Sequence, residues 1–166
     1  MVAVAATVMA MAVPTLTNVT EGSKLTAAAR EVERELQAAR LRAVSANRIL
    51  RVRMNCPGNG FFRTVEFLGE AARDTASNRC LATAYPFPAP DDDLMTRPNH
   101  DGPVRTTPPG TTVSAAIVEF HPDGRARRVE SNVAQEITTP VTITVTRRNR
   151  SRTITINGAG KIQLQP

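Results

Sequence analysis

A basic run near the end of the chain is the group of residues best placed to bind a ligand. The letters "RRNRSR" place Arg147, Arg148, Arg150 and Arg152 close together, and Lys161 follows nine positions after Arg152. Clustered arginines contact phosphates, so these five residues are candidates for a DNA-binding patch. No aromatic residue lies nearby to stack on single-stranded bases. The preferred interpretation is therefore a solvated basic turn that protects the edge of a sheet, and DNA binding is the alternative.

An acidic group precedes that region by about fifty residues. In "PDDDLMTRPNHDG" the side chains of Asp91, Asp92, Asp93, Asn99 and Asp101 offer hard oxygen ligands, which Ca²⁺ prefers. Their spacing differs from that of an EF-hand loop, which alternates its ligands and ends in a glutamate. A solvated acidic loop is therefore preferred over a calcium site.

Residues for catalysis are scarce. The chain has two histidines, His100 and His121, and neither stands in a metal-ligand spacing, so both are interpreted as solvated loop residues. The sequence contains no G-x-S-x-G, P-loop or G-x-G-x-x-G motif. We expect no enzyme, no metal, no cofactor and no small-molecule substrate.

Two cysteines, Cys56 and Cys80, make an even pair. Such a pair is compatible with one disulfide if the domain lies outside the cytoplasm, and the alternative is two buried free thiols. We predict the disulfide, on condition that the domain is extracytoplasmic.

Composition limits what these residues can belong to. The 166 residues suit one domain with an extension, and 41% hydrophobic content with six aromatics predicts a modest aliphatic core. The formal charge is +6, carried by nineteen arginines and only two lysines. A basic chain suggests nucleic acid or an anionic membrane surface as partner. The skew toward arginine is typical of GC-rich coding, which needs no partner, and this explanation is preferred.

The first residues, "MVAVAATVMAMAVPTL", are almost entirely apolar up to Val13. This run is shorter than the roughly 20 residues that cross a bilayer as a helix. It also lacks the basic region that precedes the apolar part of a secretory signal. A third interpretation is that the run continues a longer hydrophobic segment that begins upstream.

A long helix is predicted after this run. From Thr17 to Arg48 apolar residues recur at steps of three and four, among them Leu25, Val32 and Leu36, and they form one face that packs on a sheet. Together with residues 1–16 the element is expected to be one long helix. Pro14 is expected to interrupt it with a kink or a loosened turn.

Beyond residue 49 the hydrophobic period changes to two, which predicts strands. "ILRVRMNC" is a half-buried strand with its arginines on the outer face, and "FFRTVEFLG" is a second strand. Residues 70–109 form an irregular insertion with at most one short strand, around Cys80 to Ala84. The turn "HPDG" then joins two extended runs, and a hairpin and a last strand, "GKIQL", close the chain. The residues of this hairpin that are predicted to face inward are Val141, Ile143, Val145, Ile154 and Ile156. The predicted fold is α+β: a long N-terminal helix and an antiparallel two-layer β domain over residues 49–166.

This order of elements resembles the type IV pilin superfamily, and within it the H-class minor pseudopilins of type II secretion and the T-type fimbrial minor pilins. "AVPTL" is similar to the end of the pilin hydrophobic helix, and "LTAAAREVERELQAARLRAVSANRILRVRM" to the half-helix that leads into the first strand. "IVEFHPDGRA" and "ITINGAGKIQL" are similar to the central strand-turn and the C-terminal ending of the family. The family's basic leader, processing glycine, methylated residue and following glutamate are not in the sequence. The resemblance therefore implies that they lie upstream of Met1.

The resemblance implies a structural subunit at the tip of a secretion pseudopilus or a type IV pilus. It would have a single-pass inner-membrane helix, a domain in the periplasm or on the filament, and other pilins or pseudopilins as partners. Val4, Val8, Val13 and Pro14 would lie in the membrane and then in the filament core. Some T-type members take up DNA through a basic C-terminal region, which keeps DNA uptake as the alternative. The family's glycine followed by two arginines around one residue is replaced here by Gly160-Lys161-Ile162-Gln163.

Overall fold

A single long helix, α1, dominates the computed structural model, which describes residues 2–88 and 100–165 and, over 2–19, the backbone alone. It spans Val2–Ala46, 45 residues. The interruption predicted at Pro14 is absent, because α1 runs through that position as one helix. A proline removes one donor from the helix ladder, and the bonds of the flanking turns hold the helix together. The helix ends where Asn47 adopts a positive φ of 52°.

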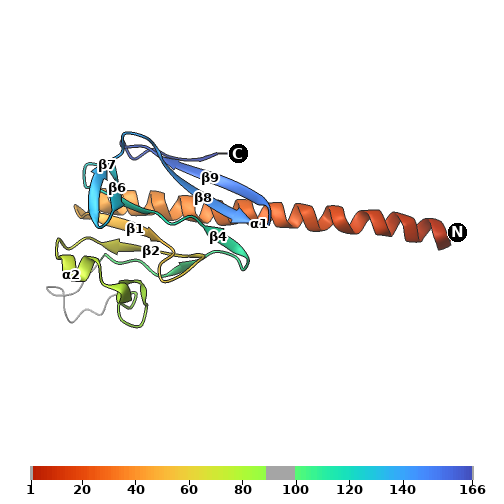
Figure 1. Ribbon diagram of the computed structural model, residues 1–166, viewed down its shortest axis with the longest axis horizontal. Coiled ribbons are helices and arrows are strands. Elements are labelled where there is room, and N and C mark those ends of the chain that lie inside the picture. Colours follow the sequence, from red (N-terminus) through yellow and green to blue (C-terminus); the bar gives the residue numbers. More distant parts are fainter. Residues whose placement is uncertain (1, 89–99, 166) are drawn as a thin grey trace.

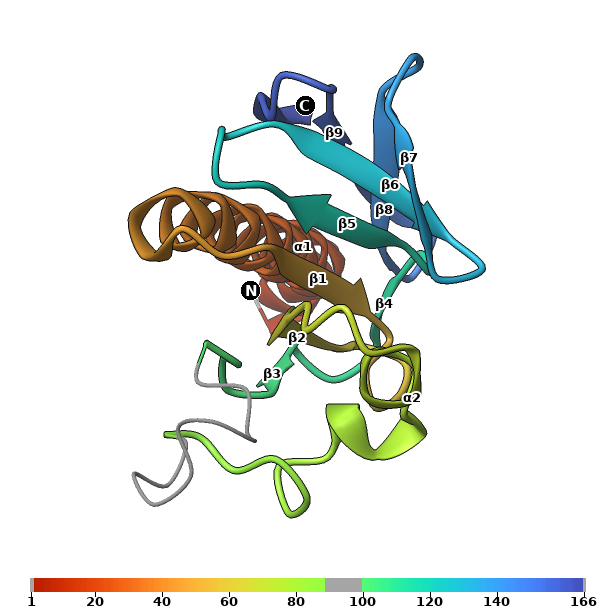
Figure 2. The same cartoon turned by 90° about the vertical axis from the view of Figure 1, so that its left-hand side faces the viewer.

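The larger of two sheets has six antiparallel strands in the order β3-β2-β1-β5-β6-β7. In chain order these are β1 (Leu50–Met54), β2 (Phe61–Glu66), β3 (Arg105–Thr106), β5 (Ile117–Phe120), β6 (Ala126–Glu130) and β7 (Val133–Glu136). The predicted "HPDG" turn joins β5 to β6, with Gly124 at φ 81°. Figure 2 shows this sheet curving around one side of α1.

The smaller sheet has four strands in the order β10-β9-β8-β4. They are β4 (Thr111–Val113), β8 (Val141–Arg147), β9 (Arg150–Ile156) and β10 (Ile162–Gln165). The run "TTVSAAIVEF", predicted as one extended segment, is divided between the two sheets. β4 pairs with β8 in the smaller sheet, whereas β5 pairs with β1 in the larger. The crossing is held where Ser114 N–H donates to Thr144 O at 2.8 Å.

The apolar core lies between α1 and both sheets (Figure 1). Leu25, Val32 and Leu36 of α1 are 0–3% exposed and belong to one cluster with the inner faces of the strands. The inward residues predicted for the hairpin are confirmed, because all five are at most 7% exposed: Val141, Ile143, Val145, Ile154 and Ile156. The predicted α+β arrangement of a helix and an antiparallel two-layer domain is confirmed.

The insertion after β2 covers the other face of the six-stranded sheet. It contains a helical turn, α2 (Ala71–Asp74), and a 3-10 turn, η1 (Ser77–Cys80). The short strand predicted around Cys80 to Ala84 is wrong, since Cys80 ends η1 and a turn follows. Alternation alone could not show that this segment would cover a sheet face instead of joining it.

Candidate functional site

The N-terminal part of α1 extends beyond the β domain (Figure 1). Among the side chains that the structure describes, which begin at residue 20, the buried apolar residues of α1 run from Leu25 to Ala43, and Figure 1 shows the strands beside the second half of the helix. At 1.5 Å per residue, the part that precedes Leu25 is roughly 35 Å long. The side chains of Val4, Val8, Val13 and Pro14 lie outside the described residues. Within the described part of the chain, no helix combines the length and the apolar character that crossing a membrane requires.

The point where α1 leaves the domain is held by the β8–β9 hairpin. Arg147 Nε lies 2.6 Å from Glu21 Oε2, and Arg148 Nε lies 3.6 Å from the same oxygen. Arg147 Nη1 also donates to Pro109 O and, at 3.2 Å, to Thr111 Oγ1. The hydrogen bond from Arg147 lowers the pKa of Glu21 below its ordinary value of 4.5. We call this cluster of Glu21, Arg147 and Arg148 the helix clamp.

The helix clamp divides the residues predicted to contact DNA. Arg147 forms a close ion pair with Glu21, whereas most of the Arg148 side chain is exposed to solvent. Arg150 lies beside α1, with Nη1 3.4 Å from the position that a Cβ on Gly22 would take. Lys161 lies past the opposite end of β9. The hairpin tip therefore helps to hold the helix, and its geometry gives no support to a single basic DNA-binding patch.

The predicted disulfide is confirmed: Cys56 and Cys80 are bonded, with their Cα atoms 5.0 Å apart. Cys56 follows β1 and Cys80 ends η1, so the bond ties the insertion to the six-stranded sheet. Both sulfur-bearing residues are buried.

Under the insertion lies a second core built on arginine, which the sequence interpretation missed. Arg79 is fully buried and donates two hydrogen bonds to Asp101, from Nε to Oδ2 and from Nη2 to Oδ1, each 3.0 Å long. Its Nη2 also donates to Glu66 O at 2.6 Å. Asp74 Oδ1 lies 3.9 Å from Arg79 Nη1. We call the buried polar groups around Arg79 and Arg63 the arginine core.

Arg63 of β2 forms the other half of the arginine core. It is fully buried and donates to the carbonyl oxygens of Gly102, Arg79, Leu81 and Tyr85, at 2.6 to 3.4 Å. None of these acceptors carries a charge, and burial lowers the pKa of Arg63. The signal in the sequence was an arginine, Arg63, in the middle of the strand "FFRTVE", just before a long insertion.

The outer face of β1 is also buried, which corrects the prediction of a half-exposed strand. Arg51 is 4% exposed, and its Nε donates to Glu119 Oε2 at 2.7 Å. Its guanidinium lies 4.0 Å from the centre of the Phe67 ring. His121 Nε2 lies 2.7 Å from the other oxygen of Glu119, so the prediction of a solvated His121 is wrong. Pairing across strands explains the first contact, because Arg51 lies directly opposite Glu119, whereas His121 follows Glu119 by two residues in the same segment.

Asp101 is likewise not a solvated loop residue, since it is 5% exposed and bonded to Arg79 and to the N–H of Glu66. Asp91, Asp92, Asp93 and Asn99 lie outside the described residues. Among the described residues, no group of three or more histidine, cysteine or carboxylate side chains could hold a metal ion. His100 is partly buried, and its N–H donates to Glu66 Oε2 at 3.3 Å.

A helix that extends from a two-sheet antiparallel domain defines the class of type IV pilin-like proteins. Comparison with known families then places the chain: residues 28–160 match the family model "Type II transport protein GspH", and the chain belongs to this family. No curated protein sequence matches it significantly.

Solved structures show the same fold at low identity. The type IV minor pilin FimU of Pseudomonas aeruginosa is 18% identical, with a TM-score of 0.53, over 89% of this chain and 92% of FimU. The minor pseudopilin EpsH from the type 2 secretion system of Vibrio cholerae is 12% identical, with a TM-score of 0.50, over 86% of this chain and 96% of EpsH. The chain is therefore a structural minor pseudopilin of a secretion system or a pilus.

Proposed function

We propose that the N-terminal part of α1 anchors the chain in the bacterial inner membrane as a single pass, with the β domain in the periplasm. The same segment would later pack beside the helices of other pilins or pseudopilins at a filament tip. Val4, Val8, Val13 and Pro14 are the residues assigned to the membrane and then to the filament core. The function is packing and assembly, not turnover.

The observation that carries the proposal is that α1 extends beyond the strands (Figure 1). Its second half buries its apolar face in the β domain through Leu25, Val32 and Leu36. The first half continues the helix with an apolar run and has no strand over it. An apolar helix without a covering layer needs another apolar environment, which a bilayer or neighbouring helices supply.

The helix clamp supports this role, because it lies where the two halves of α1 meet. Arg147, in the last position of β8, bonds to Glu21 of the helix and to Pro109 and Thr111 at the start of β4. Force on the extending helix would therefore pass into the smaller sheet at this point. The disulfide between Cys56 and Cys80 suits a domain in the oxidising periplasm.

Membrane fractionation tests the anchor. Expressed in a bacterium with a secretion system of this type, the chain should stay in the inner-membrane pellet after a carbonate wash. The substitution Val8→Arg should release it, because a charge at the centre of a membrane helix costs about 2.5–3.5 kcal/mol. Leu41→Arg is the matched control, since Leu41 is 70% exposed on the half of α1 that the β domain covers.

Protease added to spheroplasts tests the orientation, and it should digest the β domain without lysis. Release of the unsubstituted chain by carbonate, or protection of the β domain in spheroplasts, would contradict the proposal. Cysteine cross-linking from Val8→Cys to a neighbouring pilin helix would then test filament packing, with Ser23→Cys, exposed on α1, as control.

A further inference from the structure

The last strand, β10, leaves one edge of the smaller sheet open. It pairs with β9 on one side, and no other described strand pairs with it. Asn157 N–H donates to Lys161 O at 3.1 Å, which fixes the alternation of bonded and non-bonded pairs. Gln163 and Gln165 therefore bond to β9, and Ile162 and Leu164 direct their N–H and C=O groups away from the sheet.

Apart from its short length of four residues, this edge lacks the usual protection against added strands. Over Ile162–Gln165 the strand has no proline, no charged side chain and no bulge in its register. Exposed edges are commonly blunted by such features, because unpaired backbone groups are a template for another strand. The edge of β10 can therefore accept an extended segment.

A groove of about 330 Å³ lies between this edge and α1. Leu41 and Ile162 form its apolar part, and Gln37, Arg40, Gly160 and Lys161 lie around them. Leu41 is 70% exposed, which is unusual for a leucine on the domain-covered half of α1. A strand added to β10 would direct alternate side chains toward the helix, and one of them would enter this groove.

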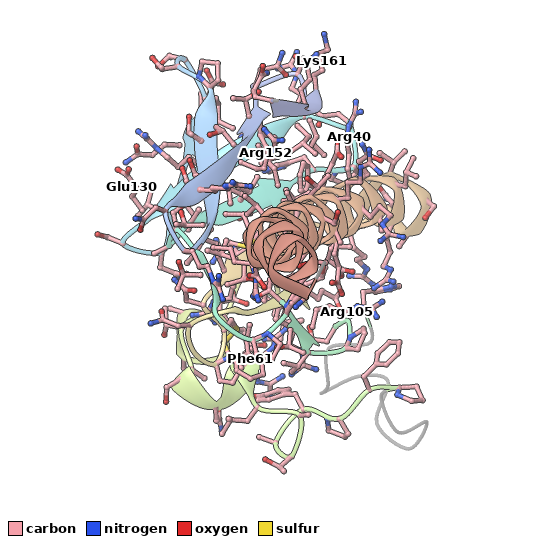
Figure 3. All side chains as sticks on the ribbon, turned by 90° about the vertical axis from the view of Figure 1, so that its right-hand side faces the viewer. Arg40, Phe61, Arg105, Glu130, Arg152 and Lys161 are labelled. Atoms are coloured by element: carbon pink, nitrogen blue, oxygen red, sulfur yellow. A yellow bond between two sulfur atoms is a disulfide. The ribbon has the colours of Figure 1, made fainter. Side chains whose placement is uncertain are left out.

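Charge around the groove is positive. Arg40 donates hydrogen bonds to Gly124 O at 2.9 Å and to Ala159 O at 3.3 Å. These backbone carbonyls position the guanidinium, and because they carry no formal charge they leave its positive charge in place. Lys161 is exposed, and Figure 3 shows it with Arg40 on the same side of α1. Glu33, which lies two turns before Leu41 along α1, is acidic, in contrast to Arg40 and Lys161.

We propose that the open edge of β10 binds an extended acidic segment of a different polypeptide, which adds as a strand. An apolar side chain of that segment would lie between Leu41 and Ile162, and its carboxylates would approach Arg40 and Lys161. Two copies of this chain would bring two positive rims together, which disfavours self-pairing. This binding site does not depend on the membrane anchor proposed above, and it can be tested separately.

A labelled synthetic peptide in which glutamate and valine alternate is the probe, mixed with the full chain in mild detergent. Fluorescence anisotropy should show binding that weakens as salt rises, because charges contribute to it. A peptide with lysine in place of glutamate should bind at least about tenfold more weakly. Hydrogen exchange should show new protection at the N–H groups of Ile162 and Leu164, whereas those of Gln163 and Gln165 are protected with or without peptide.

Two variants locate the site. Leu164→Pro removes an outward N–H that the sheet does not use and should weaken binding about tenfold, whereas Leu164→Val keeps that N–H and should bind normally. Lys161→Glu should weaken binding of the glutamate peptide and improve binding of the lysine peptide. This variant still tests the site if Leu164→Pro fails to fold.

Equal binding of the acidic and basic peptides would overturn the proposal. So would unchanged exchange at Ile162 and Leu164 in the presence of bound peptide. Dimerisation of the chain through β10, detected as a concentration-dependent loss of the same exchange without peptide, would assign the edge to a second copy and would also overturn it.

Discussion

The two faces of the six-stranded sheet are buried in opposite ways. On the face toward α1, the strands contribute Leu50, Val52, Val118 and Phe120, each fully buried against a helix rich in alanine. On the other face lie Arg51 of β1, Arg63 of β2 and Glu119 of β5, also buried. The first face is closed by apolar contact and the second by directed hydrogen bonds.

This difference predicts how substitutions on each face of the sheet reduce the stability of the fold. An apolar core loses stability in proportion to the volume removed, and neighbouring side chains partly fill the gap. The arginine core depends on matched partners, because a buried charge that loses its partner keeps its full desolvation cost. The helix-side core should therefore tolerate truncation gradually, and the arginine core should fail at single positions.

Arg79→Met should have the largest effect of a single substitution. It leaves Asp101 and Asp74 buried without their cation, which costs about 3–5 kcal/mol of unfolding free energy. Denaturant unfolding measures this loss. Adding Asp101→Asn should recover much of it, since asparagine removes the unpaired charge and still accepts from the N–H of Glu66. A loss below about 1 kcal/mol in the single variant would show that the ion pair is not needed.

Leu36→Ala tests the apolar face in the same assay. Leu36 is fully buried, and its truncation should cost about 2–5 kcal/mol. Leu41→Ala, one turn away and 70% exposed, should change stability by no more than about 0.5 kcal/mol. Similar losses in the two variants would contradict the assignment of the helix face.

Removing the disulfide with Cys56→Ser and Cys80→Ser should destabilise the insertion more than the apolar core between α1 and the sheets. The bond closes a loop across 24 positions, and its loss should cost about 2–4 kcal/mol. Hydrogen exchange should accelerate first at Ala71–Asp74 and Ser77–Cys80, and the amides of β8 and β9 should respond less. Uniform acceleration over both sheets would mean that the insertion and the apolar core unfold together.

The smallest effect is expected at the helix clamp. Arg147 lowers the pKa of Glu21, so the clamp contributes stability above pH 4.5 and loses it as pH falls through the lowered pKa. An NMR titration of the Glu21 carboxyl should give a midpoint below 4.5, and Arg147→Gln should raise it. A midpoint that Arg147→Gln leaves unchanged would show that the contact does not persist in solution.

The sequence by itself determined the helix, its apolar stripe and the hairpins, and it made the disulfide one of two possible states of the cysteines. These follow from periods of 3.6 and 2 residues, from the glycine in "HPDG" and from an even pair of cysteines, all of which are local signals. The membrane and filament roles of Val4, Val8, Val13 and Pro14 stay predictions.

Only the tertiary structure decided what becomes of the charged residues. Arg79 and Asp101 are 22 positions apart, Arg51 and Glu119 are 68 apart, and Arg147 and Glu21 are 126 apart. Each of these side chains looks solvated in its own segment, because an arginine between apolar residues marks an outer strand face. Segments that are distant in the sequence cover these side chains, and burial then requires each charge to find a partner that no local pattern reveals.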